Sequence, residues 1–140
     1  MAPVLLAPIA AVVVIAVIAG VLRLQRSSQR RLLGRVAPAG RAGTADILYF
    51  TGENCTVCHV AQRPALRRLH EAITDLQVSE IDVGVDPQVA RAYRVMTLPT
   101  TVVLDAGGRV SALNAGFVNE TLLRTQVEAA RAAVARAAVA

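Results

Sequence analysis

The sequence predicts an α/β domain in the order β-α-β-α-β-β-α, preceded by one N-terminal transmembrane helix. The first observation behind this is an apolar run from Val4 to Leu22 that contains no charged or hydrogen-bonding side chain. The second is an alternation, beyond residue 45, of short apolar runs with segments whose apolar residues recur at helical spacing. The 140 residues have room for one such domain and a short appendage. We therefore expect a transmembrane anchor (1–24), a basic flexible tether (25–45) and the α/β domain (46–140).

The apolar run is long enough for a membrane span. At about 1.5 Å per helical residue it covers the roughly 30 Å of a hydrocarbon core. A cleaved signal peptide is the alternative. Signal peptides carry positive charge ahead of the apolar core, whereas Arg23 and Arg26 follow it here. A retained anchor that contacts membrane lipid is the favoured interpretation.

The basic charge is confined to the N-terminal part of the chain. All 15 basic residues are Arg, and six of them, with no acid, lie in residues 1–43. Residues 44–140 contain nine Arg and ten acids, so the α/β domain is nearly neutral and no nucleic-acid partner is expected. Positive charge on the C-terminal side of a membrane helix favours the cytoplasmic side for that end. We expect a cytoplasmic domain on a bacterial-type cytoplasmic membrane, with an extracytoplasmic domain as the alternative.

Seven elements are predicted in the domain. In chain order they are strand 47–50, helix 61–73, strand 76–83, helix 87–93, strands 100–104 and 109–113, and a helix capped by Asn119. Ile47-Leu48-Tyr49-Phe50 is a continuous apolar run, typical of a strand buried on both faces. Asp105-Ala106-Gly107-Gly108 is a hairpin signature between two strands.

Two cysteines stand at the junction of the first strand and the following helix, in Cys55-Thr56-Val57-Cys58. Residues at i and i+3 lie on one face of a helical turn, so their sulfurs can reach bonding distance. Cys55 lies at the helix start, where free amides and the helix dipole stabilise a thiolate. Cys55 is therefore the predicted nucleophile, and Cys58 the residue that attacks the resulting mixed disulfide.

Further motifs accompany the cysteines: Pro64 in the next helix, Thr97-Leu98-Pro99-Thr100 before the hairpin, and Gly116 after it. With them, the segment from Asp46 to about Arg136 resembles the thioredoxin family. The resemblance implies a thioredoxin-like three-layer sandwich. It also implies a cis peptide bond at Pro99 close to the cysteines, and an extended substrate segment bound along Thr97, Leu98 and Pro99.

The sequence also departs from the family pattern. The usual first strand and helix are missing or degenerate, and Tyr49 stands where typical thioredoxins have a buried acid. Glu80 stands where that acid's lysine partner would lie, so Glu80 is a candidate for proton transfer, with an ordinary surface acid as the alternative. His59 is a second candidate, because a protonated imidazole would place positive charge near the sulfurs; an exposed helix histidine is its alternative.

Two other uses of the cysteines are weaker interpretations. Cys55 to His59 matches the CxxCH pattern of haem attachment, with Met96 as second ligand, but the strand pattern argues against a haem protein. A zinc site would need His59 and His70 beside the cysteines, and His70 shares a helix stripe with arginines, which favours a solvated side chain. We predict no metal and no cofactor.

The predicted function is that of a membrane-anchored thiol–disulfide oxidoreductase. It would act on protein thiols and disulfides through Cys55 and Cys58, with an electron donor or acceptor that the sequence does not identify. The alternative is a membrane-tethered binding or assembly protein without redox turnover.

Overall fold

The computed structural model describes residues 3–35 and 47–139. They form two compact units, Met1–Arg31 and Leu32–Ala140. Each unit is described by itself.

The first unit is a single helix, α1 (Pro3–Arg30). Its stretch Ile9–Ser28 is long and apolar enough to span a membrane. A signal sequence near an N-terminus would have the same length and composition. The helix continues beyond residue 24, where the sequence placed the end of the anchor. Four of residues 25–30 are Arg or Gln, which are good helix formers, and extending an existing helix adds one hydrogen bond per residue. Residues 25–30 are therefore helical and not part of a flexible tether.

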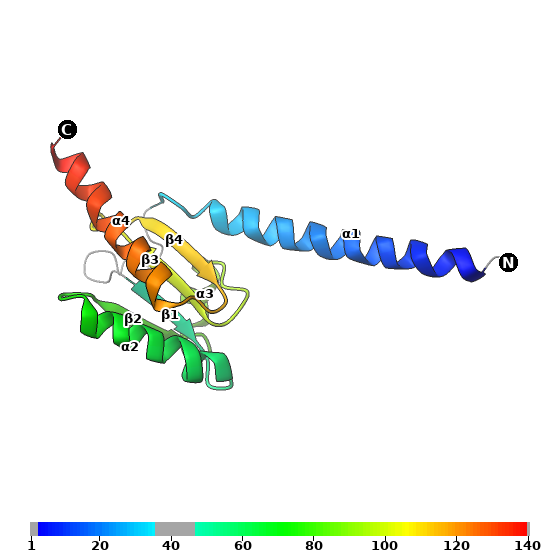
Figure 1. Ribbon diagram of the computed structural model, residues 1–140, viewed down its shortest axis with the longest axis horizontal. Coiled ribbons are helices and arrows are strands. Elements are labelled where there is room, and N and C mark those ends of the chain that lie inside the picture. Colours follow the sequence, from blue (N-terminus) through cyan, green and yellow to red (C-terminus); the bar gives the residue numbers. More distant parts are fainter. Residues whose placement is uncertain (1–2, 36–46, 140) are drawn as a thin grey trace. The chain divides into compact units, whose positions relative to one another are not determined.

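The second unit is built on a four-stranded mixed sheet in the order β2-β1-β3-β4 (Figure 1). Its strands are β1 (Ile47–Thr51), β2 (Val78–Asp82), β3 (Thr100–Leu104) and β4 (Val110–Ala115). Its helices are the π-helical turn η1 (Cys58–Gln62), α2 (Arg63–Ala72), α3 (Pro87–Ala92) and α4 (Glu120–Val139). β1 pairs with β2 in parallel and with β3 antiparallel, and β3 pairs with β4 antiparallel.

Alternate residues of the central strand β1 serve two different cores. Ile47 and Tyr49 pack in a cluster with buried residues of α2 and α4, whereas Leu48 and Phe50 pack in a cluster with α3. This is the alternation expected of a strand covered on both faces. The result is three layers, with α2 and α4 on one face of the sheet and α3 on the other.

A short segment that follows α1 in the chain belongs to this second unit. The Gly34 amide donates to the Val110 carbonyl (2.7 Å), and the Val110 amide donates to the Arg35 carbonyl (2.9 Å). Leu32 is 5% exposed. Residues 32–35 are thus bound to the start of β4, although the sequence predicted that they belong to the tether. The rest of that predicted tether, residues 36–45, lies outside the described residues.

The helix that follows the cysteines does not begin as a regular α-helix. Cys58–Gln62 form a π turn, in which the Arg63 amide donates to the Cys58 carbonyl five residues earlier. Pro64 follows at the start of α2. Proline has no amide hydrogen and its ring crowds the carbonyl four residues before it, so a wider turn at this point avoids both problems. The sequence predicted ordinary helical spacing here.

Candidate redox site

Cys55 and Cys58 form a disulfide, with an S–S distance of 2.05 Å and a Cα–Cα distance of 5.3 Å. β1 ends at Thr51, and a short loop then carries the chain to Cys55, immediately before the first helical residue, Thr56. The two sulfurs differ in their surroundings. Cys58 is fully buried, whereas Cys55 is half-buried. A reagent from solvent can therefore reach the disulfide only at Cys55.

A backbone amide of the helix start faces the Cys55 sulfur. The Cys58 amide donates to Cys55 Sγ at 3.2 Å. When the disulfide opens, the same amide and the positive end of the helix dipole favour a thiolate on Cys55. The local geometry thus gives Cys55 the chemistry of the attacking sulfur.

Tyr49 lies beneath Cys58, the buried cysteine of the pair. Its side chain is 1% exposed, and its hydroxyl donates to the Cys58 carbonyl at 2.9 Å. A longer contact of 3.4 Å joins the hydroxyl to Thr51 Oγ1. Burial is the largest cause that raises the pKa of Tyr49, so the phenol stays protonated at neutral pH and acts as a donor. In the sequence, Tyr49 stood out only as a departure from the family pattern. Most buried tyrosine hydroxyls form a hydrogen bond, so a tyrosine in a buried strand just before the cysteines was the available signal.

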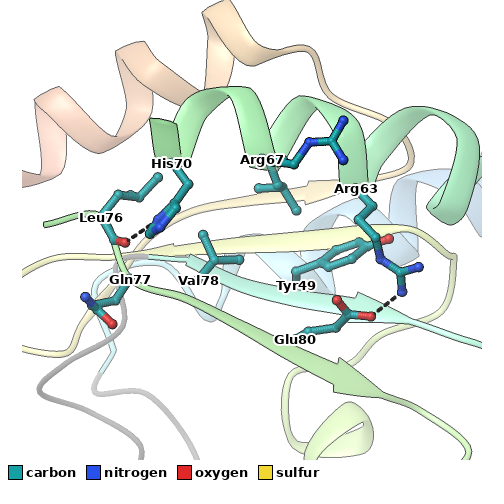
Figure 2. A pocket seen from close by; sticks show the side chains of 9 residues that line it. Tyr49, Arg63, Arg67, His70, Leu76, Gln77, Val78 and Glu80 are labelled. Carbon is teal, nitrogen blue, oxygen red and sulfur yellow. Dashed lines mark hydrogen bonds and ion pairs between the residues drawn. The ribbon is translucent and has the colours of Figure 1, made fainter. Parts of the chain in front are cut away.

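Glu80 lies opposite Tyr49 in the β1–β2 register, as Figure 2 shows. Its carboxylate forms an ion pair with the Arg63 guanidinium, on the solvent side of the phenol. The hydrogen bond with Glu80 also raises the pKa of Arg63. The Glu80 side chain is 44% exposed, so solvent screens the pair. The structure thus brings Glu80 to Arg63 and Tyr49, and its carboxylate is bonded to the guanidinium, not to a sulfur.

His59 has both ring nitrogens engaged. Arg63 donates to Nδ1 at 2.9 Å, and Nε2 lies 3.1 Å from the Glu53 carbonyl. Because a guanidinium can only donate, Nδ1 must be the acceptor and Nε2 must carry the hydrogen. His59 is thus held between the Arg63 guanidinium and the Glu53 carbonyl by its two hydrogen bonds.

A groove of about 660 Å³ opens beside the accessible sulfur. Its lining includes Cys55, the loop before it and the half-buried Leu98. The Leu98–Pro99 peptide bond is cis. The Pro99 carbonyl accepts from the Gly116 amide (2.7 Å), and the Thr97 carbonyl accepts from the Thr100 hydroxyl (2.6 Å). Of the three predicted substrate residues, the structure brings Leu98 to the same groove as Cys55.

A second cavity, of about 320 Å³, lies between α2 and the edge strand β2 (Figure 2). The Tyr49 ring, Leu66 and Val78 line its apolar part, and Arg63 with Glu80 closes one end. At the other end the His70 ring bonds the Leu76 carbonyl at 2.9 Å. His70 is exposed, as the sequence predicted, and its ring also bonds the backbone of the loop that follows α2. Among the described residues, no group of three His, Cys, Asp or Glu is placed to hold a metal ion.

Comparisons with known proteins agree on the fold. No protein-family model matches the sequence, and no curated protein matches it. Solved structures do match. A mutant thioredoxin from Halobacterium salinarum is 29% identical, with a TM-score of 0.53 over 61% of this chain and 74% of that one. Thioredoxin 1 from Thermosipho africanus is 26% identical (TM-score 0.52; 59% and 89% covered). Oxidized mitochondrial thioredoxin 3 from Saccharomyces cerevisiae is also 26% identical (TM-score 0.53; 60% and 78% covered).

The geometry and the comparisons lead to the same description. The cysteines stand at the end of a central strand, at the start of a helix, and form the only disulfide among the described residues. The chain has a thioredoxin-like α/β fold with a four-stranded mixed sheet and a CxxC disulfide, Cys55–Cys58, as its candidate redox centre.

Proposed function

We propose that the chain is a membrane-anchored thiol–disulfide oxidoreductase that exchanges its Cys55–Cys58 disulfide with protein thiols and disulfides. The observation that carries the proposal is the asymmetry of the pair: Cys55 is accessible at a helix start, and Cys58 is buried one turn further on. A disulfide that solvent reaches at one sulfur, with a backbone amide donating to that sulfur, is suited to reversible exchange.

The exchange balances without a cofactor. In the reduced protein, the Cys55 thiolate attacks one sulfur of a substrate disulfide and expels the other as a thiolate. Cys58 then loses its proton, for which Glu80 and His59 are the candidate acceptors, and attacks Cys55, which closes the protein disulfide and releases the second substrate thiolate. The substrate gains two electrons and the protein loses two. Repeated turnover requires a dithiol reductant in this direction, or a disulfide oxidant in the reverse one.

The groove beside Cys55 supports a protein substrate. Its volume is larger than two reacting sulfur atoms would occupy, and both Cys55 and Leu98 line it. An extended segment laid along it would bring its own cysteine to the accessible sulfur. We propose that Thr97, Leu98 and Pro99 bind that segment. Glu80 and His59 remain candidates for proton transfer, although both are engaged with Arg63 in the oxidised state.

The activity can be measured directly on the full chain in detergent micelles. With dithiothreitol as reductant, the protein should accelerate insulin reduction, and Cys55→Ser should abolish the acceleration. Reduced Cys58→Ser protein, freed of dithiothreitol before insulin is added, should instead accumulate a mixed disulfide with an insulin chain, and later addition of dithiothreitol should reverse it. Cysteines that react with neither insulin nor dithiothreitol would contradict redox turnover and favour the alternative, a membrane-tethered binding or assembly protein.

We further propose that α1 anchors the protein in the membrane with the redox domain in the cytoplasm. Support comes from the apolar stretch of α1 and from the six arginines of residues 1–43, none of which precedes that stretch. In sealed cells, a membrane-impermeant maleimide should label Cys55 only after permeabilisation. Labelling of intact cells would place the domain outside and redirect the proposed activity to exported proteins.

A further inference from the structure

The carbonyl of the resolving cysteine accepts two hydrogen bonds. One comes from the Tyr49 hydroxyl in β1, at 2.9 Å, and the other from the Arg63 amide across the π turn. A carbonyl oxygen has two lone pairs, so both are used here. Tyr49 reaches Cys58 from the central strand, and Arg63 reaches it from the start of α2.

The π turn is held at its other end as well. Gln62, the last residue of η1, is fully buried and makes a reciprocal pair with the Val118 backbone. Its Nε2 donates to the Val118 carbonyl at 3.1 Å, and its Oε1 accepts from the Val118 amide at 2.9 Å. The turn is therefore tied to β1 through Cys58 and to the loop before α4 through Gln62.

These ties matter because π turns are rare and occur mostly as single turns inserted in α-helices. Without external partners, the turn could relax toward other backbone geometries whenever the disulfide is open. Such relaxation would move Cys58 relative to Cys55. The rate of an intramolecular attack depends steeply on how well the two reacting atoms are held in position.

We propose that Tyr49 is a positioning residue for the second step of thiol–disulfide exchange, because its hydroxyl holds the backbone of Cys58 in place for attack on the Cys55 mixed disulfide. The Tyr49 hydroxyl is bonded to the Cys58 carbonyl and to Thr51, not to a sulfur, so it acts through the backbone. The inference deepens the proposed function, since it concerns the closing step of that same exchange.

The test separates the two steps in the full chain in detergent micelles. One equivalent of 5,5′-dithiobis(2-nitrobenzoate) is mixed with the reduced protein. Attack by Cys55 releases the first thionitrobenzoate, at a rate proportional to reagent concentration. Attack by Cys58 on the resulting mixed disulfide releases the second, at a rate independent of reagent concentration. Each release is followed by its absorbance.

Tyr49→Phe removes the hydroxyl and keeps the ring. We expect the second release to slow about tenfold, the effect of losing one well-formed hydrogen bond from the reacting arrangement, while the first release stays within about twofold of the unmodified protein. Tyr93→Phe is the matched control. Tyr93 is also 1% exposed, but its hydroxyl has no hydrogen-bond partner among the described residues, so both releases should be unchanged.

An unchanged second release in a folded Tyr49→Phe protein would overturn the proposal, as would equal slowing of both releases. If Tyr49→Phe does not fold, Gln62→Met can be used instead, because it removes the two hydrogen bonds that join the end of the π turn to the Val118 backbone. The second release should then slow selectively, and an unchanged second release in that variant would overturn the proposal. Failure of the proposed function looks different: both releases would be normal, but insulin would not be reduced.

Discussion

At the scale of single residues, burial separates the two cysteines. After reduction, we expect N-ethylmaleimide to modify Cys55 faster than Cys58 by at least about tenfold, because Cys58 has no exposed surface and modification requires local opening. Mass spectrometry of digested samples quenched at short times gives the two rates. Faster modification of Cys58 across neutral pH would contradict the assignment of Cys55 as the nucleophile.

The buried Tyr93 hydroxyl predicts a loss of stability at high pH. Burial raises the pKa of Tyr93 to about 12, above the value of about 10 in an unfolded chain. A raised pKa means that the folded state favours the protonated phenol, so this contribution is complete below about pH 10 and is lost as the pH rises toward about 12. Urea unfolding should show that the free energy of unfolding falls between about pH 9 and about pH 11.5. Tyr93→Phe should make this fall smaller, by about 2 kcal/mol at most. Burial raises the pKa of Tyr49 too, so part of the fall should remain.

At the scale of elements, the strands and the last helix were predicted closely because local sequence dictates them. The run Ile47–Phe50 forms β1, and the hairpin signature at Asp105–Gly108 joins β3 and β4. Asn119 caps α4, where its Oδ1 accepts from the Leu122 amide at 2.9 Å. In each case the residues within the element, or next to it, set its position.

The elements that could not be predicted depend on distant partners. Residues 32–35 have a tether-like composition, and they are held in place by hydrogen bonds with Arg109 and Val110 and by the burial of Leu32. The π turn follows from Pro64, but its ties to Tyr49 and Val118 join residues far apart in the chain. At the candidate site, spacing was enough to identify Cys55 and Cys58. The spacing of four residues allows His59 to meet Arg63 on one helix face, but no spacing rule could show that Arg63 would also reach Glu80 in β2.

The segment at residues 32–35 should contribute to the stability of the redox domain. Leu32→Ala removes a side chain that is 5% exposed, and we expect it to lower the free energy of unfolding by about 2 kcal/mol. Urea denaturation of the full chain in micelles measures the change. Leu33→Ala is the control, because Leu33 is 45% exposed and should have a much smaller effect. Equal effects of the two substitutions would show that residue 32 does not belong to the core.

At the scale of the whole molecule, the charge and apolar content of the chain are divided between its parts. Residues 1–43 are apolar and basic, and residues 44–140 are nearly neutral. We expect the full chain to remain in the membrane pellet after an alkaline carbonate wash, and a chain that lacks residues 1–31 to appear in the supernatant. The intact mass of the membrane-bound protein distinguishes the two interpretations of α1, because a cleaved signal would leave a mature protein without the apolar stretch.

The difference in exposure between the two sulfurs also sets how reaction partners can share the site. Under the proposed function, the molecule that supplies electrons and the molecule that takes them must both approach through Cys55, since Cys58 is closed to solvent. They cannot be bound there together, so each must leave before the other arrives. Steady-state kinetics with two varied substrates should therefore give parallel double-reciprocal lines, the ping-pong pattern, and a high concentration of either partner should inhibit the other.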